Sequence, residues 1–358
     1  MVRLLRARSA ERPPPTSAAA MADPGGAPAA VPYTGADYTV QGVEALEDCL
    51  RENGVAILPS VLDPAECEAM KDGLWAGLEH VSAEWDTPLR RAEPRTWAGF
   101  YRHLYPKHHM LLQHFGLGQL QCAWDVRQNP RVVDAFARLW RVPAEDLICS
   151  MDGVAVHLPP EVTGRGWHRE ADNKLHCDQC FRDSSLVSYQ GLVTANGFDE
   201  GDATLTFLRG SHLCHEAAAA RFAGELGTAA HWNQLTPAMI RAYIDEHGCT
   251  QECVKCPAGS LVLWDSRTIH SGRRPSRGRA APNERYVVYV CMTPRDRAKP
   301  ASMRKRLKAF ADKRVTGHNP HRPLLFPRLP RTFGAALPPM RAVPDPRLSA
   351  LGRRLVGF

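Results

Sequence analysis

The sequence of 358 residues contains no apolar run long enough to cross a membrane, and no internal repeat is visible. A membrane-spanning helix needs about 20 consecutive, mostly apolar residues. The sequence therefore excludes a helical membrane protein and does not indicate a repeat architecture. With 44% hydrophobic residues the chain can still bury a substantial core, so we expect one catalytic domain.

The 11 cysteines do not form the compact framework of a small secreted protein, because they are scattered and odd in number. Reduced thiols are expected, and a cytoplasmic location fits them best. Two close pairs, Cys177 with Cys180 and Cys253 with Cys256, leave a zinc-stabilised non-catalytic binding protein as an alternative. The long interval between the pairs argues against a zinc ribbon, so buried free thiols are the preferred interpretation.

The N-terminal segment, residues 1–36, is dominated by Ala, Pro, Gly, Ser and Arg, with little that could pack. We expect it to be disordered. Its arginines allow an organellar transit peptide, but Met21 would be an ordinary second start site and the prolines interrupt any amphipathic helix. The catalytic domain is expected over 37–295, followed by a basic, Pro-rich extension over 296–358 packed on that domain.

The most informative motif is His176-Cys177-Asp178, with His270 much further along the chain. Residues two apart on a strand point to the same face, so His176 and Asp178 could reach one metal ion from one strand. His270 follows a short apolar run, 259–265, that reads as another strand. Two imidazoles and one carboxylate are the set that holds one face of Fe(II) and leaves the opposite face open for oxygen chemistry.

An arginine opens a later strand of β-branched and aromatic residues, 285–292. The planar guanidinium of Arg285 could bind a carboxylate through two hydrogen bonds, which lysine cannot do. An arginine that follows His270 within the next predicted strand suggests a 2-oxoglutarate site. Arg277 and Arg279 lie in the preceding loop and are rivals for the same role.

With these pieces in their order, residues 40 to 295 resemble the phytanoyl-CoA dioxygenase superfamily of non-haem Fe(II)- and 2-oxoglutarate-dependent oxygenases. The resemblance rests on the HxD motif, on three further stretches, 189–193, 201–212 and 259–270, and on Arg285. It implies an α+β fold whose centre is a double-stranded β-helix, a jelly-roll barrel, with flanking helices. It also implies that His176, Asp178 and His270 bind Fe(II), and that the 2-oxoglutarate contacts come from Arg285, Gln190 and Ser271.

The implied reaction is hydroxylation of a small molecule with release of succinate and CO2, using dioxygen and 2-oxoglutarate as cosubstrates; ascorbate as a reductant would be compatible. Gly272 departs from the family pattern, which often has a small hydroxyl residue two positions after the distal histidine. The net charge of +7 is concentrated late in the chain, so a nucleic-acid-directed oxygenase is an alternative. A solvated basic helix is the simpler interpretation.

Capping signals predict three helices. Asp63-Pro64 begins one that runs to Leu78, another covers Pro130 to Trp140, and Thr236-Pro237 begins a third that Gly248 closes. Short apolar runs between them predict the strands, at 154–158, 186–193, 203–208 and 261–264.

Overall fold

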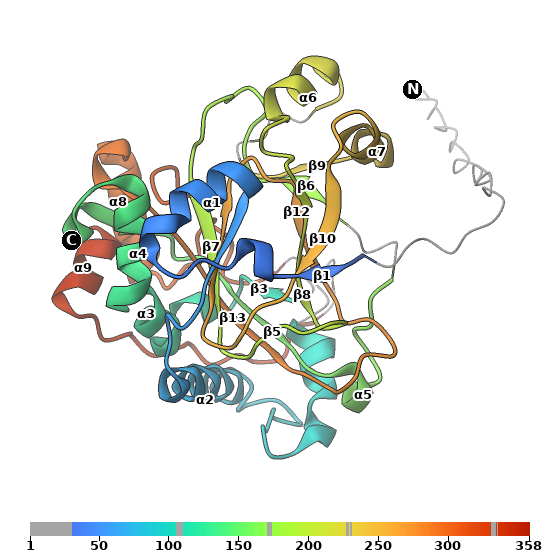
Figure 1. Cartoon of the computed structure of the whole chain (residues 1–358). Coiled ribbons are helices and arrows are strands. Elements are labelled where there is room, and N and C mark those ends of the chain that lie inside the picture. Colours follow the sequence, from blue (N-terminus) through green and yellow to red (C-terminus); the bar gives the residue numbers. More distant parts are fainter. Residues whose placement is uncertain are drawn as a thin grey trace, which may run out of the picture. The chain divides into compact units, whose positions relative to one another are not determined.

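The computed structural model describes residues 31–104, 110–169, 174–226, 229, 231–330, 334 and 336–358. Residues 1–30, which hold most of the segment expected to be disordered, lie outside these ranges. Pro32–Phe358 form one compact unit, in which two sheets lie at the centre and helices surround them (Figure 1). Within the described ranges, no helix is long and apolar enough to span a membrane.

The first sheet has six strands in the order β1-β10-β8-β12-β6-β9. Only β1 and β10 pair in parallel; the other neighbours are antiparallel. The strand bounds are β1 Tyr33–Thr34, β6 His176–Cys177, β8 Thr204–Arg209, β9 Asn233–Gln234, β10 Thr250–Val254 and β12 His270–Arg273.

The second sheet has seven strands, in the order β2-β11-β7-β13-β5-β3 with β4 paired to the far end of β13. Among the described residues its paired strands are all antiparallel. The strand bounds are β2 Val55–Leu58, β3 Leu111–Leu112, β4 Leu147–Cys149, β5 Val154–His157, β7 Tyr189–Thr194, β11 Leu261–Asp265 and β13 Arg285–Pro294.

The α+β class is confirmed, and the structure is a mixed fold built on two largely antiparallel sheets. The expected closed barrel is not confirmed. Among the described residues each sheet keeps two edge strands, β1 and β9 in one and β2 and β3 in the other, so strand pairing does not close either sheet. The predicted runs 154–158, 186–193, 203–208 and 261–264 became β5, β7, β8 and β11 with small shifts of their ends.

Capping chemistry determines where the predicted helices begin. In α2, Asp63 accepts a hydrogen bond from the Glu66 amide, and the Glu66 side chain accepts one from the Asp63 amide, with Pro64 at the first helical position. In α7 the Thr236 hydroxyl accepts from the Met239 amide. The helix bounds are α1 Leu46–Asn53, α2 Pro64–Val81, α3 Gln121–Arg127, α4 Pro130–Trp140, α5 Pro160–Thr163, α6 His215–Arg221, α7 Pro237–Asp245, α8 Pro300–Ala311 and α9 Ala350–Val356.

The helices cover the outer faces of the two sheets. Contacts of α1 with β2, of α2 to α4 with β13 and of α9 with β4 place these helices on the seven-stranded sheet. Next to the six-stranded sheet, α6 and α7 close a separate apolar cluster with β6 and β8, and Figure 1 shows this pair apart from the other helices. The space between the sheets is therefore where their inward side chains meet.

Candidate metal centre

The triad predicted from the sequence is brought together where β6 pairs with β12. His176 lies directly opposite His270 in the antiparallel register, and Asp178 follows two residues after His176. Cys177 points away from this site and is buried in the cluster under α6 and α7. Among the described residues, His176, Asp178 and His270 are the one group of three or more candidate ligands whose ligand atoms all lie within 4.8 Å of one another.

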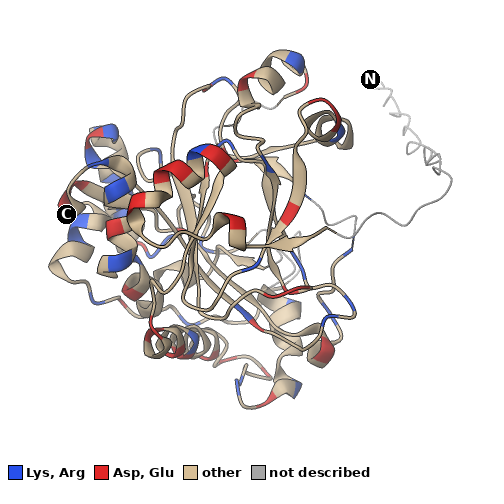
Figure 2. Ribbon diagram, viewed as in Figure 1, with Lys and Arg blue, Asp and Glu red and all other residues tan. Residues whose placement is uncertain are grey.

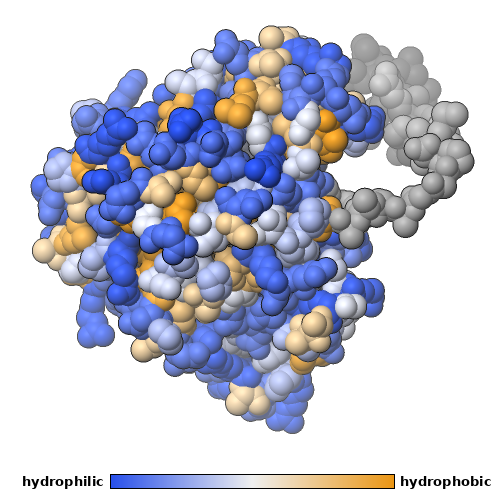
Figure 3. Space-filling view, in the orientation of Figure 1, coloured by the Kyte–Doolittle hydropathy of each residue, from blue (hydrophilic) through white to orange (hydrophobic). Residues whose placement is uncertain are grey.

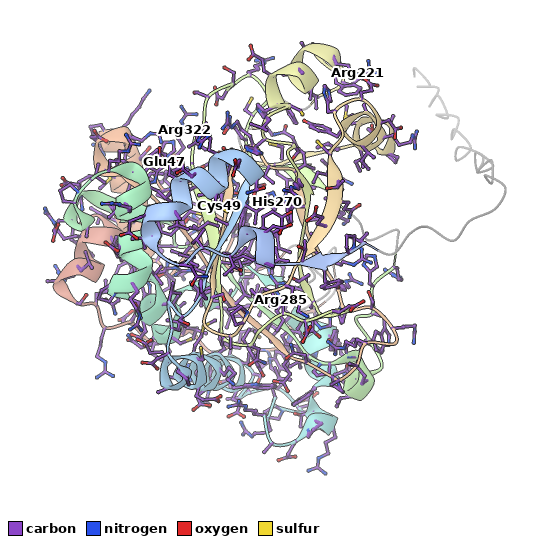
Figure 4. All side chains as sticks on the ribbon, in the orientation of Figure 1. Glu47, Cys49, Arg221, His270, Arg285 and Arg322 are labelled. Carbon is purple, nitrogen blue, oxygen red and sulfur yellow. The ribbon has the colours of Figure 1, made fainter. Side chains whose placement is uncertain are left out.

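Backbone carbonyls fix the orientation of both imidazoles. His176 Nδ1 lies 2.8 Å from the Lys174 carbonyl oxygen, and His270 Nδ1 lies 2.9 Å from that of Thr268. A carbonyl only accepts, so each Nδ1 carries the proton and donates it. Each Nε2 is left for the site, at 3.4 Å from an oxygen of Asp178. Figure 4 shows His270 near the middle of the molecule.

The electrostatics of this arrangement call for a cation. Burial lowers the pKa of His176 to about 4, so its Nε2 is an unprotonated lone pair near neutral pH. Burial alone would raise the pKa of Asp178, but the imidazoles of His318, His176 and His270 outweigh it and hold that pKa well below its ordinary range. A lone pair facing a carboxylate oxygen is repulsive, and a shared metal ion relieves the repulsion. These residues therefore fit a divalent metal through two neutral nitrogens and one carboxylate.

Gln190 supports the carboxylate ligand. Its Nε2 donates to Asp178 Oδ2 at 3.1 Å, while its Oε1 accepts a short hydrogen bond from Trp264 Nε1. All three side chains are buried, and Gln190 and Trp264 are directly paired between β7 and β11. The structure thus places Gln190 beside the candidate ligand Asp178, and its expected contact with 2-oxoglutarate stays a prediction.

Arg285 begins β13 and projects into the interior. Only 2% of it is exposed, and none of its three guanidinium nitrogens has a hydrogen-bond partner in the part of the chain that the structure describes. Its guanidinium carbon lies 5.1 Å from the centre of the Phe198 ring. A buried cation without partners is costly, so the site fits a small dicarboxylate whose distal carboxylate would pair with it.

The two rival arginines have other uses. Arg279 is paired to two carboxylates, through Nε to Glu161 at 2.7 Å and through Nη1 to Asp202 at 2.8 Å. Arg277 is exposed and lies over the Trp167 ring, 5.0 Å from its centre. Of the three candidates, Arg285 is the one that is buried without a carboxylate partner among the described residues.

Ser271 and Gly272 lie on opposite faces of β12. Ser271 pairs with Thr206, so it is turned away from the face that carries His270, and its hydroxyl lies 3.4 Å from the Gly272 carbonyl oxygen. Gly272 shares the face of His270, but a Cβ atom there would lie 3.0 Å from Met110 Cε. Met110 thus fills the space that a hydroxyl residue would use in the family pattern.

Tyr289 is a site residue that the sequence analysis did not single out. It lies four residues after Arg285 on the same face of β13. Burial raises the pKa of its hydroxyl, and its charge interactions with Arg285 and Asp178 place it near both groups. Its position on an inward face was predictable from strand alternation, but the role of that face depended on the neighbouring sheet.

The cysteine pairs do not form a zinc site among the described residues, because no cysteine belongs to the candidate ligand group there. None of the 11 cysteines, all of which the structure describes, forms a disulfide. Burial raises the pKa of Cys253 to about 11 and that of Cys256 to about 12, which favours thiols over the thiolates that zinc requires. The interpretation as buried free thiols agrees with this arrangement.

A His-Asp-His centre on paired strands, with an unmatched buried arginine in the facing sheet, defines a non-haem iron oxygenase that uses 2-oxoglutarate. The family model for phytanoyl-CoA dioxygenase (PhyH) matches residues 50–279, more than half of the sequence. The chain belongs to this family and is an Fe(II)- and 2-oxoglutarate-dependent enzyme.

One curated relative is the Ava biosynthesis cluster protein O of Aspergillus versicolor, 27% identical over 218 residues, which cover 58% of this chain and 66% of that protein. One similar solved structure is AviO1 from Streptomyces viridochromogenes, with 14% identity, coverage of 73% of this chain and 97% of that one, and a TM-score of 0.45. Another is the α-ketoglutarate-dependent epimerase SnoN from nogalamycin biosynthesis, with 16% identity, coverage of 70% of this chain and 83% of that one, and a TM-score of 0.37.

Proposed function

We propose that this enzyme hydroxylates a small-molecule substrate and converts 2-oxoglutarate to succinate and CO2. The observation that carries the proposal is the pair of Nε2 atoms, each 3.4 Å from Asp178, with the Nδ1 atoms committed to carbonyls. When bound, Fe(II) and 2-oxoglutarate would supply the oxidising chemistry at this centre.

The chain's own residues would bind, orient and shield. Gln190 would keep Asp178 turned toward the metal through its hydrogen bond at 3.1 Å. Arg285 would bind the distal carboxylate of 2-oxoglutarate, and the Tyr289 hydroxyl would provide the neutral contact that Gly272 cannot. Ser271, turned to the opposite strand face, is a weaker candidate for that contact.

The substrate would approach beside His176. The Trp232 ring lies 5.8 Å from the His176 ring, and 48% of Trp232 remains exposed. Lys174, two residues before His176, is exposed as well. A large exposed aromatic ring next to a metal ligand suits stacking of a flat or apolar part of a small molecule.

The nucleic-acid alternative gains no support from the late basic residues, many of which serve the fold. Figure 2 shows Lys and Arg on and around α8. Within that region Arg306 is fully buried, Arg314 donates to the Phe326 carbonyl, and Lys313 donates to that of Val343. In the face that Figure 3 shows, apolar residues form small separate patches in a hydrophilic surface, so an extended stacking platform is not evident there.

We also propose that the two sheets are the halves of a double-stranded β-helix. The chain alternates between them as such a fold requires: β5, β7, β11 and β13 lie in one sheet, and β6, β8 and β12, which separate them in sequence, lie in the other.

The test is to load the purified chain with Fe(II) under anaerobic conditions, then add oxygen, 2-oxoglutarate, ascorbate and a metabolite extract. We expect extract-dependent succinate formation and a metabolite that gains one oxygen atom. Asp178→Ala should abolish both, whereas Asp183→Ala, at a partly exposed carboxylate near the site, should retain them. Substrate oxidation coupled to succinate in the Asp178→Ala variant would refute the proposal.

A further inference from the structure

The loop after α8 brings a third imidazole to the metal centre. His318 Nδ1 lies 3.5 Å from Asp178 Oδ2, close to the 3.4 Å that separates the carboxylate from each ligand histidine. His318 does not belong to the group whose ligand atoms all lie within 4.8 Å of one another. It therefore contacts the carboxylate ligand without joining the ligand set.

The loop that carries His318 is attached to the domain on both sides of this residue. On one side the Thr316 amide donates to the Met151 carbonyl at 2.8 Å, and the Met151 amide donates to the Thr316 hydroxyl at 3.0 Å. On the other side the Ser188 hydroxyl lies 3.2 Å from Asn319 Oδ1. Ser188 immediately precedes β7, the strand that carries Gln190, so the two supports of Asp178 are linked.

Arg306 of α8 also binds the loop that carries His318, through a backbone carbonyl. Its side chain is fully buried and donates to the carbonyls of Pro320, Cys149, Leu355 and Val356, which belong to the loop, β4 and α9. Burial lowers its pKa to about 10, so the guanidinium remains charged near neutral pH. A buried cation that satisfies four carbonyls fixes the C-terminal segment against the seven-stranded sheet.

We propose that His318 is a positioning residue for the metal centre: with Gln190 it fixes the orientation of the Asp178 carboxylate through Oδ2, the oxygen that His270 Nε2 also approaches at 3.4 Å. The inference rests on the function proposed above. Gln190 Nε2 and His318 Nδ1 approach the same oxygen, at 3.1 and 3.5 Å. Ligating carboxylates are generally held by such donors, which would fix the direction in which Asp178 meets the metal.

The contact at 3.5 Å is slightly longer than a hydrogen bond. His318 Nε2 has no hydrogen-bond partner among the described residues, so no bond on that side holds the ring in place. His318 lies beyond the residues that the family model matches, which end at 279, so this support is a feature of the chain's C-terminal segment.

The test uses the full chain and Co(II), an oxygen-stable substitute for Fe(II) at this type of site. His318→Phe keeps the ring's shape and removes the donor, and His318→Asn restores a donor near the place of Nδ1. His321→Phe, at a buried histidine of the same loop, is the matched control. Co(II) affinity is measured by competition with a chelator, the absorption spectrum of bound Co(II) reports its geometry, and melting of the metal-free chains reports folding.

We expect His318→Phe to weaken Co(II) binding about 10- to 100-fold and to change the spectrum. His318→Asn should recover most of the affinity and the spectrum, and His321→Phe should bind as the wild type does. Equal affinities for His318→Phe and the wild type, or no recovery in His318→Asn, would overturn the inference while the proposed function stands. A wild-type chain that binds neither Co(II) nor Fe(II) would refute the proposed function itself.

Discussion

Replacing Arg285 by Met should separate ligand binding from folding. A hydrogen bond to a charged group contributes about 1.5–3 kcal/mol, so a guanidinium that binds the 2-oxoglutarate carboxylate through two bonds contributes about 3–6 kcal/mol. Losing both should weaken 2-oxoglutarate binding by roughly two to four orders of magnitude. Arg285→Lys keeps the charge but not the fork, so it should lose about 10- to 150-fold.

Without 2-oxoglutarate the same change should have little cost. Only 2% of the residue is exposed and no carboxylate among the described residues pairs with it; a neutral group, the Tyr289 hydroxyl, interacts with the guanidinium, so the wild-type chain carries a buried cation without a counter-charge. The Phe198 ring at 5.1 Å recovers about 0.5–2 kcal/mol of this penalty. An apolar side chain of similar length avoids the penalty, so we expect the free energy of unfolding to stay equal or rise.

The assay is calorimetric titration of 2-oxoglutarate into the Co(II)-loaded chain, together with thermal unfolding with and without 2-oxoglutarate. Arg279→Met is the control, because Arg279 is already paired with Glu161 and Asp202. It should lower stability and leave 2-oxoglutarate affinity nearly unchanged. If Arg285→Met instead unfolds more easily and binds 2-oxoglutarate as the wild type does, Arg285 is a structural residue and our reasoning is wrong.

Two further predictions concern the buried surroundings of the site. Burial lowers the pKa of His157 to about 3 and that of His321 to about 4. Since the unfolded chain takes up these protons near pH 6.5, the free energy of unfolding should fall as the pH drops from about 6.5 to about 3. Urea unfolding across this range measures the slope, which should be smaller in His321→Phe; a slope that is unchanged there would contradict the assignment. Gly272→Ser should cost no more than about 1 kcal/mol, because among the described residues its Cβ would meet only Met110 Cε, the end of a flexible side chain, at 3.0 Å. Adding Met110→Ala should reduce that cost in the same unfolding experiment, and additive costs would show that the two positions do not compete for space.

Local signals predicted the helices and strands well where their causes are local. The capping box of Asp63 and Glu66 fixes the start of α2, and α4 spans the predicted Pro130 to Trp140. Closure of the sheets could not be predicted in the same way, because it depends on which edge strands pair across the fold. The late basic residues were expected on a solvated helix, but Arg306 is buried. Four backbone carbonyls that are near it in space, but distant in sequence, accept hydrogen bonds from its guanidinium.

The metal triad was predictable because strand alternation makes the HxD spacing meaningful before any fold is known. The orientation of Ser271 follows from the same alternation, since neighbours of His270 must face the other way. The residues that support Asp178 were harder to predict from the sequence. Gln190, which was expected at 2-oxoglutarate, donates to Asp178 Oδ2 and accepts from Trp264, its partner in the strand register. His318 belongs to no motif, and only the folded chain brings its loop to the centre.

Because the supports of Asp178 come from outside the sequence motifs, the family match ends before the last residues that we assign to the site. The match ends at residue 279, before Arg285 and before the segment that carries His318. The two candidate histidine ligands come from two short paired strands, whose side-chain directions are fixed by the backbone. A two-residue strand such as β6 cannot by itself hold Asp178, which lies just beyond its end. The carboxylate must therefore be held by side chains from other segments, and the structure offers Gln190 from the facing sheet and His318 from the C-terminal segment.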